Sequence, residues 1–560
     1  MNKTKYLALA FAALTLGACT SDDVVSTGGG KDDGNATGYM SFAINLPTMS
    51  GNTRAGWGDG TGVFDDGEES EYAVRDARVY FINSEGTIIQ TSTPVLSWTG
   101  TPSDQNVTKV SAIVTLESPL TDPASVLVVL NPSSKLPDVT DGTTKYSDFN
   151  KAISSTAATD FCSIDVTSKV AENIMMTNAP IVVADQSDGA EADDKIVQTL
   201  VPITADDIKT TEEASVAAPV TVYVERVLAK VTVSSTGITG PDDATFSVVG
   251  WEIDNTNTTT YPVRNTGFYA EDSKNFLEDS KWALSDINRF YGTATNPVRT
   301  YFAEDPNYSS NGTFTWDSDG NGATLKENQP GYCLENTFDL TRQIGTQATR
   351  VLLKASYAPK MKSGESFTGA LAGYTAGEKF FIMGSQPATL YSAQELAKII
   401  EAEVVKDDLY DFTISQGKTP DVDETKLKAA AATNKLQITA DLFKDNVVTG
   451  KSDAFAELSN ALMIKVYDPS ATYYEIPIKH FGDALTPWTT GSYGTNEKAY
   501  LGRYGVVRNN WYEINIKSVS GPGDPVPPTP DGGQIDKDTR YISFTINILS
   551  WAKRSQDVHL

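Results

Sequence analysis

The chain has 560 residues, of which 40% are hydrophobic and 9% aromatic, and its formal net charge is −27. This length and composition are typical of a globular protein with two or more domains, and they argue against a disordered chain. The strongly acidic balance predicts a surface that repels phosphate backbones, so no nucleic-acid partner is expected.

The first residues have the pattern of an export signal and do not belong to the fold. Lys3 and Lys5 precede an apolar run that ends at Cys19 and is too short for an ordinary membrane span. Residues 16–19, Leu-Gly-Ala-Cys, resemble a lipobox, in which cleavage before Cys19 is followed by acylation of its thiol. An ordinary secretory signal with Cys19 placed by chance is the alternative. Residues 1–18 are therefore predicted to be a lipoprotein signal peptide.

From about Ala73 the chain consists of short alternating runs of β-branched and aromatic residues, separated by Gly, Asn, Asp and Pro. This pattern predicts a mainly antiparallel sandwich or barrel. Helical signals are few. Ser392 and Glu395 form a capping box ahead of an apolar helical face, and residues 423–436 are a second candidate helix.

Two segments suggest how the chain divides. A domain boundary is predicted near Arg226, inside a long strand-like run at 220–235 that polar segments flank. Residues 521–540 form a Pro/Gly-rich linker that cannot join a central strand, so it sets the tail apart from the body. The predicted units after the signal peptide are a removable segment at 19–54, an N-terminal domain at 55–226, a C-terminal domain at 227–520, the linker, and the tail at 541–560.

The sequence offers little material for catalysis. Its two histidines are His480 and His559, and Cys162 and Cys333 are the cysteines besides Cys19. A Ser-His-Asp triad, a Cys-His pair or a histidine zinc site would have almost nothing to use. We therefore predict no catalytic residue, no metal site, no cofactor and no enzymatic activity, and a structural disulfide is not favoured.

Two other stretches carry weaker signals. Residues 317–322, Asp-Ser-Asp-Gly-Asn-Gly, fit the first half of a calcium loop, but its twelfth position is Asn328 instead of Glu, which favours a hairpin turn. The aromatic residues of 296–316 would suit a sugar-binding platform, and the packed aromatics of a sandwich are the favoured alternative.

One strand occurs twice, once near each end of the chain. Residues 39–46 read YMSFAINL and residues 541–548 read YISFTINI, with five identities in the same register. In an extended strand the large apolar side chains of each copy fall on one face. They are Met40, Phe42, Ile44 and Leu46 in the first copy and Ile542, Phe544, Ile546 and Ile548 in the second, with Trp551 just beyond as a further anchor.

Arg54 follows the first copy in a glycine-rich segment, and cleavage between Arg54 and Ala55 would release that copy. Its loss would open an apolar groove and leave backbone groups unpaired. The second copy, on the tail of another molecule, is predicted to refill the groove by strand addition. Such a head-to-tail contact does not close on itself, so it produces a filament. Two ordinary neighbouring strands of one sheet are the alternative.

These features resemble the fimbrillins of Bacteroidales, the shaft subunits of type V pili, and most of all the major subunit of the short (minor) fimbria. The acidic residues after Cys19 also resemble the export signal of surface lipoproteins in Bacteroidales. The segments that carry the resemblance are the lipobox, residues 52–56 (NTRAG), 172–180 (ENIMMTNAP), 224–233 (VERVLAKVTV) and 503–519 (RYGVVRNNWYEINIKSV), followed by the linker and the tail.

The resemblance implies two β-sandwich-like (transthyretin-like) domains with a few short helices and a C-terminal donor strand. It also implies a precursor in the outer membrane, removal of the N-terminal strand by an Arg-specific protease, and polymerisation with accessory anchor and tip subunits at the cell surface, in support of adhesion. The presence of both Arg54 and the tail favours the shaft role.

Three functions stay open at this point. The first is the polymerising subunit. The second is a monomeric surface glycan-binding lipoprotein that stays anchored through Cys19, or a fimbrial tip adhesin. The third, a secreted hydrolase, is disfavoured because the sequence lacks a catalytic constellation.

Overall fold

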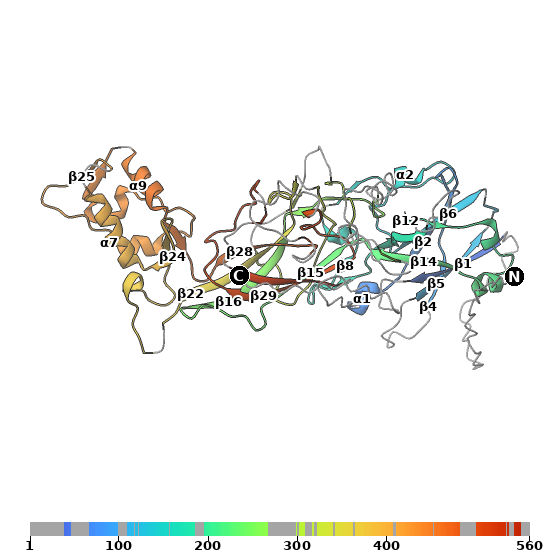
Figure 1. Cartoon of the computed structure of the whole chain (residues 1–560), viewed down its shortest axis with the longest axis horizontal. Coiled ribbons are helices and arrows are strands. Elements are labelled where there is room, and N and C mark those ends of the chain that lie inside the picture. Colours follow the sequence, from blue (N-terminus) through green and yellow to red (C-terminus); the bar gives the residue numbers. More distant parts are fainter. Residues whose placement is uncertain are drawn as a thin grey trace, which may run out of the picture.

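The structure is a computed structural model of the whole chain, and it shows an elongated, mainly β protein with a few short helices, as predicted (Figure 1). It describes residues 38–45, 67–98, 109–116, 118–120, 122–155, 157–184, 195–266, 298–299, 302–308, 316–317, 322–339, 342–361, 364–406, 410–451, 453–481, 486, 500–533, 535–536 and 542–549.

The N-terminal part is built on a nine-stranded sheet. Its strand order is β3-β2-β6-β10-β14-β1-β5-β4, and β13 pairs with β6 outside this path. The strands are β1 (Gly38–Asn45), β2 (Ala77–Asn83), β3 (Ile88–Ser92), β4 (Val95–Trp98), β5 (Lys109–Leu116), β6 (Pro123–Leu130), β10 (Met176–Asn178), β13 (Val201–Pro202) and β14 (Val220–Arg226). Alternate residues of these strands share one buried apolar cluster, because successive side chains of a strand point to opposite faces.

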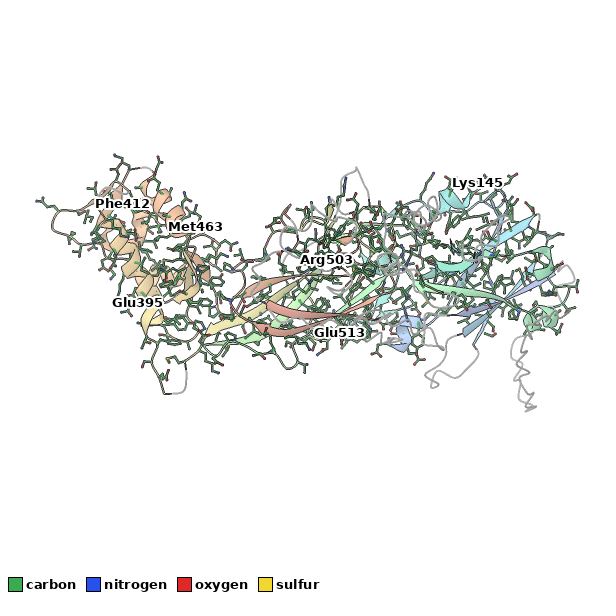
Figure 2. All side chains as sticks on the ribbon, viewed as in Figure 1. Lys145, Glu395, Phe412, Met463, Arg503 and Glu513 are labelled. Carbon is green, nitrogen blue, oxygen red and sulfur yellow. The ribbon has the colours of Figure 1, made fainter. Side chains whose placement is uncertain are left out.

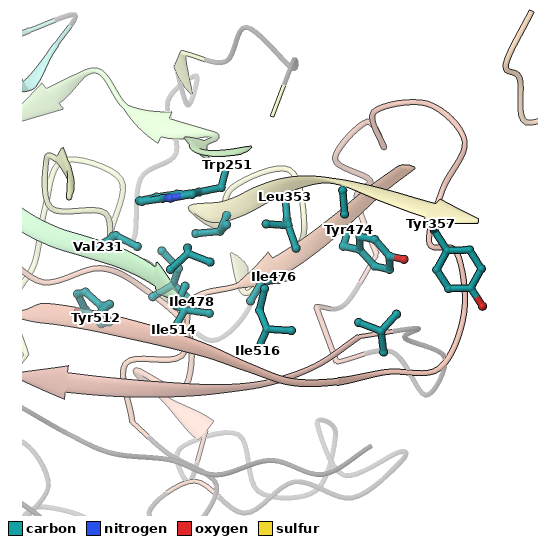
Figure 3. Close-up of a cluster of buried hydrophobic side chains, with 14 of the residues drawn as sticks. Val231, Trp251, Leu353, Tyr357, Tyr474, Ile476, Ile478, Tyr512, Ile514 and Ile516 are labelled. Atoms are coloured by element: carbon teal, nitrogen blue, oxygen red, sulfur yellow. The ribbon is translucent and has the colours of Figure 1, made fainter. Parts of the chain in front are cut away.

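The C-terminal part is a sandwich of two sheets. One contains β21 (Gly331–Cys333), β15 (Ala229–Ser234), β29 (Trp511–Val519) and β30 (Ile542–Leu549), in that order. The other contains β16 (Ala244–Asp254), β22 (Arg350–Pro359) and β28 (Thr472–Pro477). Figure 3 shows the core between them, where Trp251, Leu353 and Ile476 of the second sheet face Val231, Tyr512 and Ile514 of the first.

A third unit, which we call the helical lobe, is inserted between the paired strands β22 and β28. It contains β23 (Phe380–Met383), β24 (Gln386–Tyr391), α7 (Ala393–Val404), β25 (Phe412–Ile414), α8 (Glu424–Ala429), β26 (Val448–Gly450), α9 (Ala454–Leu462) and β27 (Lys465–Tyr467). The helical lobe has a hydrophobic core of its own and projects at the end of the molecule opposite to β1 (Figures 1 and 2).

Two of its helices were predicted from sequence. The Ser392 hydroxyl accepts a hydrogen bond from the Glu395 backbone N–H at 3.1 Å and so caps α7, and Asp423 caps α8 in the same way. The sequence analysis missed α9, whose N-terminal residue Asp453 makes no side-chain capping bond. It also missed that these elements form a separate unit.

Short elements connect these units. The helices are α1 (Glu69–Tyr72), α2 (Tyr146–Phe149) and α3 (Glu212–Ala217), with 3₁₀ turns η1 (Ala158–Asp160), η2 (Ala205–Asp207), η4 (Gly369–Leu371), η5 (Ala440–Leu442) and η6 (Lys444–Asn446). The short strands are β7 (Ile153–Ser154), β8 (Ser163–Ile164), β9 (Ala171–Glu172), β11 (Ile181–Ala184), β12 (Lys195–Gln198), β17 (Thr256–Asn257), β18 (Thr259–Thr260), β19 (Val298–Arg299) and β20 (Trp316–Asp317).

The run at 220–235, which the sequence suggested to be one long strand, is two strands in two different sheets. β14 ends at Arg226, and β15 begins at Ala229 in the C-terminal sandwich. The residues between them are fully buried, and the Leu228 carbonyl accepts a hydrogen bond from the Asn509 backbone at 2.7 Å. The chain therefore changes sheets at this point because residues from the far end of the sequence hold the crossing in place.

Buried charges reinforce this junction. Arg508 is completely buried, donates to the Thr260 hydroxyl and the Tyr261 carbonyl, and lies 3.4 Å from the Glu335 carboxylate. Arg226 donates to Asn509 from both its backbone and its guanidinium. Two of the segments that carry the resemblance, 224–233 and 503–519, thus meet here.

A second buried ion pair ties α1 to the same junction. The Lys230 ammonium lies 2.8 Å from the Glu71 carboxylate and 4.0 Å from the centre of the Trp511 ring, and the Tyr332 hydroxyl donates to Glu71. Burial, followed by the nearby Glu71 charge, raises the pKa of Tyr332, so its hydroxyl keeps the proton that it donates.

We expect Arg508→Met to lower the free energy of unfolding by about 3–5 kcal/mol, because it leaves the Glu335 carboxylate buried without its cation. The double variant Arg508→Met/Glu335→Leu should lose less of the free energy of unfolding, because no buried charge is left without a partner. Urea unfolding measures both. The control is Lys451→Met, which breaks an exposed ion pair with Asp411 and should cost no more than about 1 kcal/mol. Equal losses for the Arg508 and Lys451 variants would contradict this interpretation of the junction.

Candidate functional site

The first copy of the repeated strand lies inside the nine-stranded sheet as β1. Along one edge it pairs in parallel with β14, with Phe42 opposite Val220. Along the other it pairs antiparallel with β5 over its whole length, with Phe42 opposite Ala112. The pairing with β14 covers Phe42 to Asn45, so β1 has a strand partner on each edge. We call the space that it fills between β14 and β5 the β1 slot.

The large side chains of β1 fill the core of this part of the molecule. Met40, Phe42 and Ile44 have no exposed surface, and the rings of Phe42 and Phe81 lie 6.4 Å apart. Burial of three such side chains contributes on the order of 5–9 kcal/mol before ordering costs. Leu46, the fourth predicted member of this face, lies outside the described residues. Removing β1 would uncover a continuous apolar surface.

The opposite face of β1 is also covered. The short helix α3 packs against β1 and β5, and Ser41 is only 4% exposed beneath it. The Ser41 and Ser215 hydroxyl oxygens lie 2.8 Å apart. The sequence analysis missed α3, and its one local signal was Thr211, whose hydroxyl accepts from the Ala214 backbone N–H and caps the helix.

The second copy lies in a different sheet. It forms β30, the edge strand of the four-stranded sheet, and within the described residues it pairs antiparallel with β29 alone. Its register shifts by one residue between Ile516 and Ser518. The two copies are therefore not neighbours in one sheet, which removes the alternative that the sequence left open. Ile542, Phe544, Ile546 and Ile548 belong to β30, and Trp551 lies outside the described residues.

The linker lies along the body in this structure rather than standing clear of it. Asp524 and Tyr473 exchange two backbone hydrogen bonds, and the Pro528 carbonyl accepts from the Arg350 guanidinium. The Asp536 carboxylate pairs with Arg503, and the Arg503 side chain is almost completely buried. Sequence reasoning missed these contacts, since a Pro/Gly-rich composition does not indicate what a segment packs against.

The residues predicted for lipidation and processing, Cys19, Arg54 and Ala55, lie outside the described residues. They stay predictions. In the part of the chain that is described, β1 ends at Asn45 and the next element, α1, begins at Glu69.

The cysteine and histidine side chains that the sequence analysis considered for catalysis or metal binding lie packed within the fold where they are described. Cys162 and Cys333 are free thiols, and burial raises the pKa of each to about 12. His480 is buried, and its Nδ1 lies 2.8 Å from the Tyr512 hydroxyl. Within the described ranges, no group of three or more His, Cys, Asp or Glu side chains is placed to hold a metal ion.

The stretch considered for sugar binding is packed inward where it is described. Phe302 has no exposed surface, and its ring lies 5.9 Å from that of Tyr308 and 6.5 Å from that of Phe481. A cavity of about 510 Å³ lies elsewhere, between 157–169 and the C-terminal sandwich, and Tyr332 is its one aromatic lining residue. No stacked aromatic platform appears in either place among the residues that the structure describes.

None of the helices in the described part of the chain combines the length and the apolar character that a bilayer span requires.

Residues 465–557 match the family model described as major fimbrial subunit protein type IV, fimbrillin, C-terminal. This segment is similar to the C-terminal region of fimbrillins. It contains β27 to β30, so the second copy of the repeated strand falls inside it. The predicted resemblance to the fimbrillins is thereby confirmed.

Fimbrial proteins are also found among the solved structures that are similar to this chain. A fimbrilin from Porphyromonas gingivalis W83 is 13% identical over 94% of this chain and 99% of its own, with a TM-score of 0.33. A fimbrial assembly protein from Parabacteroides distasonis is 13% identical over 63% of this chain and 93% of its own, with a TM-score of 0.27. The fimbrial anchor protein Mfa2 from P. gingivalis is 8% identical over 92% and 99%, with a TM-score of 0.23. A search of curated proteins found no match.

In the uncut chain, Phe42→Ala is expected to lower the free energy of unfolding by about 3–5 kcal/mol, because it leaves a cavity in the centre of the β1 slot. Ala43→Ser, at the half-exposed neighbouring position, should change it by less than about 0.5 kcal/mol. Thermal or urea unfolding of the two variants measures the difference. If both substitutions had the same effect, β1 would not be a structural part of the sheet.

Proposed function

We propose that this protein is a structural subunit of a surface fimbria and that its subunits join by donor-strand exchange. The proposal rests on one observation. The same strand sequence occurs as a doubly paired central strand, β1, and as a singly paired edge strand, β30, at the end of the chain. One copy fills a slot that needs a strand, and the other is held weakly enough to be given away.

The exchange is favoured by the number of partners that each position offers. In its own chain β30 forms one backbone ladder, with β29. In the β1 slot of a second molecule it would form two, with β14 and with β5, and place large apolar side chains at the three buried positions of Met40, Phe42 and Ile44. A net hydrogen bond contributes about 0.5–1.5 kcal/mol, and each buried side chain about 1.5–3 kcal/mol. The neighbouring slot is therefore the more stable place for the tail.

The slot must first be emptied. Cleavage between Arg54 and Ala55 would disconnect β1 from α1 and from everything that follows. The lipid on Cys19 would leave with the released segment, residues 19–54, so one cut would both free the subunit from the membrane and open the slot. Until then β1 occupies the slot and prevents polymerisation.

This mechanism defines the partners of the protein. They are further copies of the same chain, joined head to tail, together with an Arg-specific protease and the outer membrane that holds the acylated precursor. Anchor and tip subunits would end the polymer on either side. The expected location is the fimbria at the cell surface, where the polymer would support adhesion. No enzymatic role is proposed.

The first test replaces the cleavage site. We expect Arg54→Ala to abolish SDS-resistant multimers when purified precursor lacking residues 1–18 is treated with an arginine-specific protease, because β1 then stays in its slot. Mass spectrometry should find a new N-terminus at Ala55 in the unmodified chain only. The matched control is Arg75→Ala, which changes an exposed arginine after α1 and should leave the multimers intact.

The second test removes the tail. A chain truncated after Gly533 should be cut at Arg54 as efficiently as the full chain but should stay monomeric, because it has no strand to donate. Unheated SDS gels compare the two samples. Clean cleavage of the full chain without multimers would refute donor-strand exchange and favour the anchored glycan-binding lipoprotein or a tip protein.

A further inference from the structure

The hydrogen bond between Ser41 and Ser215 has a defined direction. The Ser215 hydroxyl donates its one hydrogen to the Glu212 carbonyl at 2.7 Å, inside α3. It can therefore only accept from Ser41, which lies 2.8 Å away, and Ser41 must be the donor. The Ser215 side chain is 1% exposed, so water does not replace this donor if it is lost. The strand in the β1 slot has to supply a hydroxyl at this position.

The tail supplies the same hydroxyl. With the two copies aligned, Ser543 takes the place of Ser41, and Phe544 takes the place of Phe42. On the apolar face every second residue is large in both copies, so the identity of Phe544 has an evident packing reason. Ser41 points away from that core, so packing in the core does not explain why a serine recurs at this position. The contact with α3 accounts for why this residue recurs.

Alternation of apolar residues does not by itself fix how far a strand enters. A shift by two residues keeps the same side chains on the same face and would still bury the apolar row. A second marker is needed on the other face. We propose that Ser215 sets the register of the incoming tail, by accepting a hydrogen bond from Ser543 of a second copy of this chain. This inference rests on the proposed function.

In the two alternative registers, the tail residue beneath α3 fits Ser215 less well than Ser543 does. A shift by two residues one way brings Tyr541 beneath α3, and its phenol is far too large for a covered serine position. A shift the other way brings Thr545, which has a hydroxyl but adds a methyl group where Ser41 is 4% exposed. It also places Ile546, instead of Phe544, against Phe81.

The same geometry marks where the matched segment begins. Tyr39 exchanges two backbone hydrogen bonds with Lys209, at 2.7 and 2.8 Å. At Gly38 a Cβ atom would lie 2.6 Å from Cγ2 of Ile208. The tail carries Arg540 at that position. A tail in this register therefore follows the path of β1 only from Tyr541 onward, which is where the sequence identity starts.

Disulfide trapping in the full, processed chain measures the register directly. Ser111 of β5 lies opposite Ala43, whose counterpart in the tail is Thr545. We expect Ser111→Cys/Thr545→Cys chains to form a reducible covalent ladder during assembly. Ser111→Cys/Asn547→Cys chains report the shift that brings Thr545 beneath α3. They should give at least about ten times less crosslinked ladder. Within one chain β5 and β30 belong to different sheets, so a bond inside a single subunit is not expected.

The serines are then removed. Ser543→Ala should reduce the ratio of the two crosslinks about five-fold, because the proposed register alone loses its buried hydrogen bond while Thr545 keeps a hydroxyl in the shifted register. Ser215→Ala removes the acceptor from both registers, and adding Ser543→Ala to it should cause no further loss, because the two residues act through one bond. The matched control is Ser356→Ala, which removes an exposed serine–serine contact with Ser247 on the C-terminal sandwich and should leave the ratio unchanged.

The outcomes separate this inference from the proposed function. If no pair of cysteines gives a ladder and no SDS-resistant multimer forms, donor-strand exchange itself is refuted. If the Thr545→Cys ladder forms but Ser543→Ala leaves the ratio unchanged, the exchange stands and Ser215 does not set the register. Preferential crosslinking at Asn547→Cys in the unmodified serine background would likewise overturn the register proposed here.

Discussion

The structure depends on the pairing of β1 with β14 on one edge and β5 on the other. A strand held on both edges and buried through Met40, Phe42 and Ile44 cannot leave without opening the centre of the N-terminal sheet. Its near-copy β30 is held on one edge. This difference between a central and an edge position would give the proposed exchange its direction, since the two strands have nearly the same side chains and differ mainly in how many neighbours they have.

The β1 slot and β30 are linked through continuous, well-anchored backbone. β14 lines the slot and passes into β15 after two buried residues, β15 pairs with β29, and β29 holds β30. The buried pairs of Glu71 with Lys230 and Glu335 with Arg508 fasten this path at the crossing between sheets. Such pairs contribute little net stability, but removing one partner of a pair is costly.

The helical lobe stands outside this arrangement. It enters and leaves through β22 and β28, which are paired neighbours, and it has its own core. At its base Tyr467 also packs in the sandwich core and donates to the Gly523 carbonyl of the linker, whereas β1, β14 and β5 have no described residue in the core of the lobe. Lengthening the connection between adjacent strands costs little because loop-closure entropy grows slowly with length. A chain can therefore carry such an insertion without changing how its subunits would join.

The sequence by itself determined the β class, the cap of α7, the presence of a helix within 423–436, and the repeated strand with its apolar face, because these depend on local periodicity and on short-range hydrogen bonds. It did not reveal that 220–235 is divided between two sheets, since an apolar run does not state which neighbours it pairs with. Only the tertiary structure placed β1 between two strands and β30 at an edge. It also brought α3 over Ser41 from 174 residues away, and no local pattern could have shown that contact.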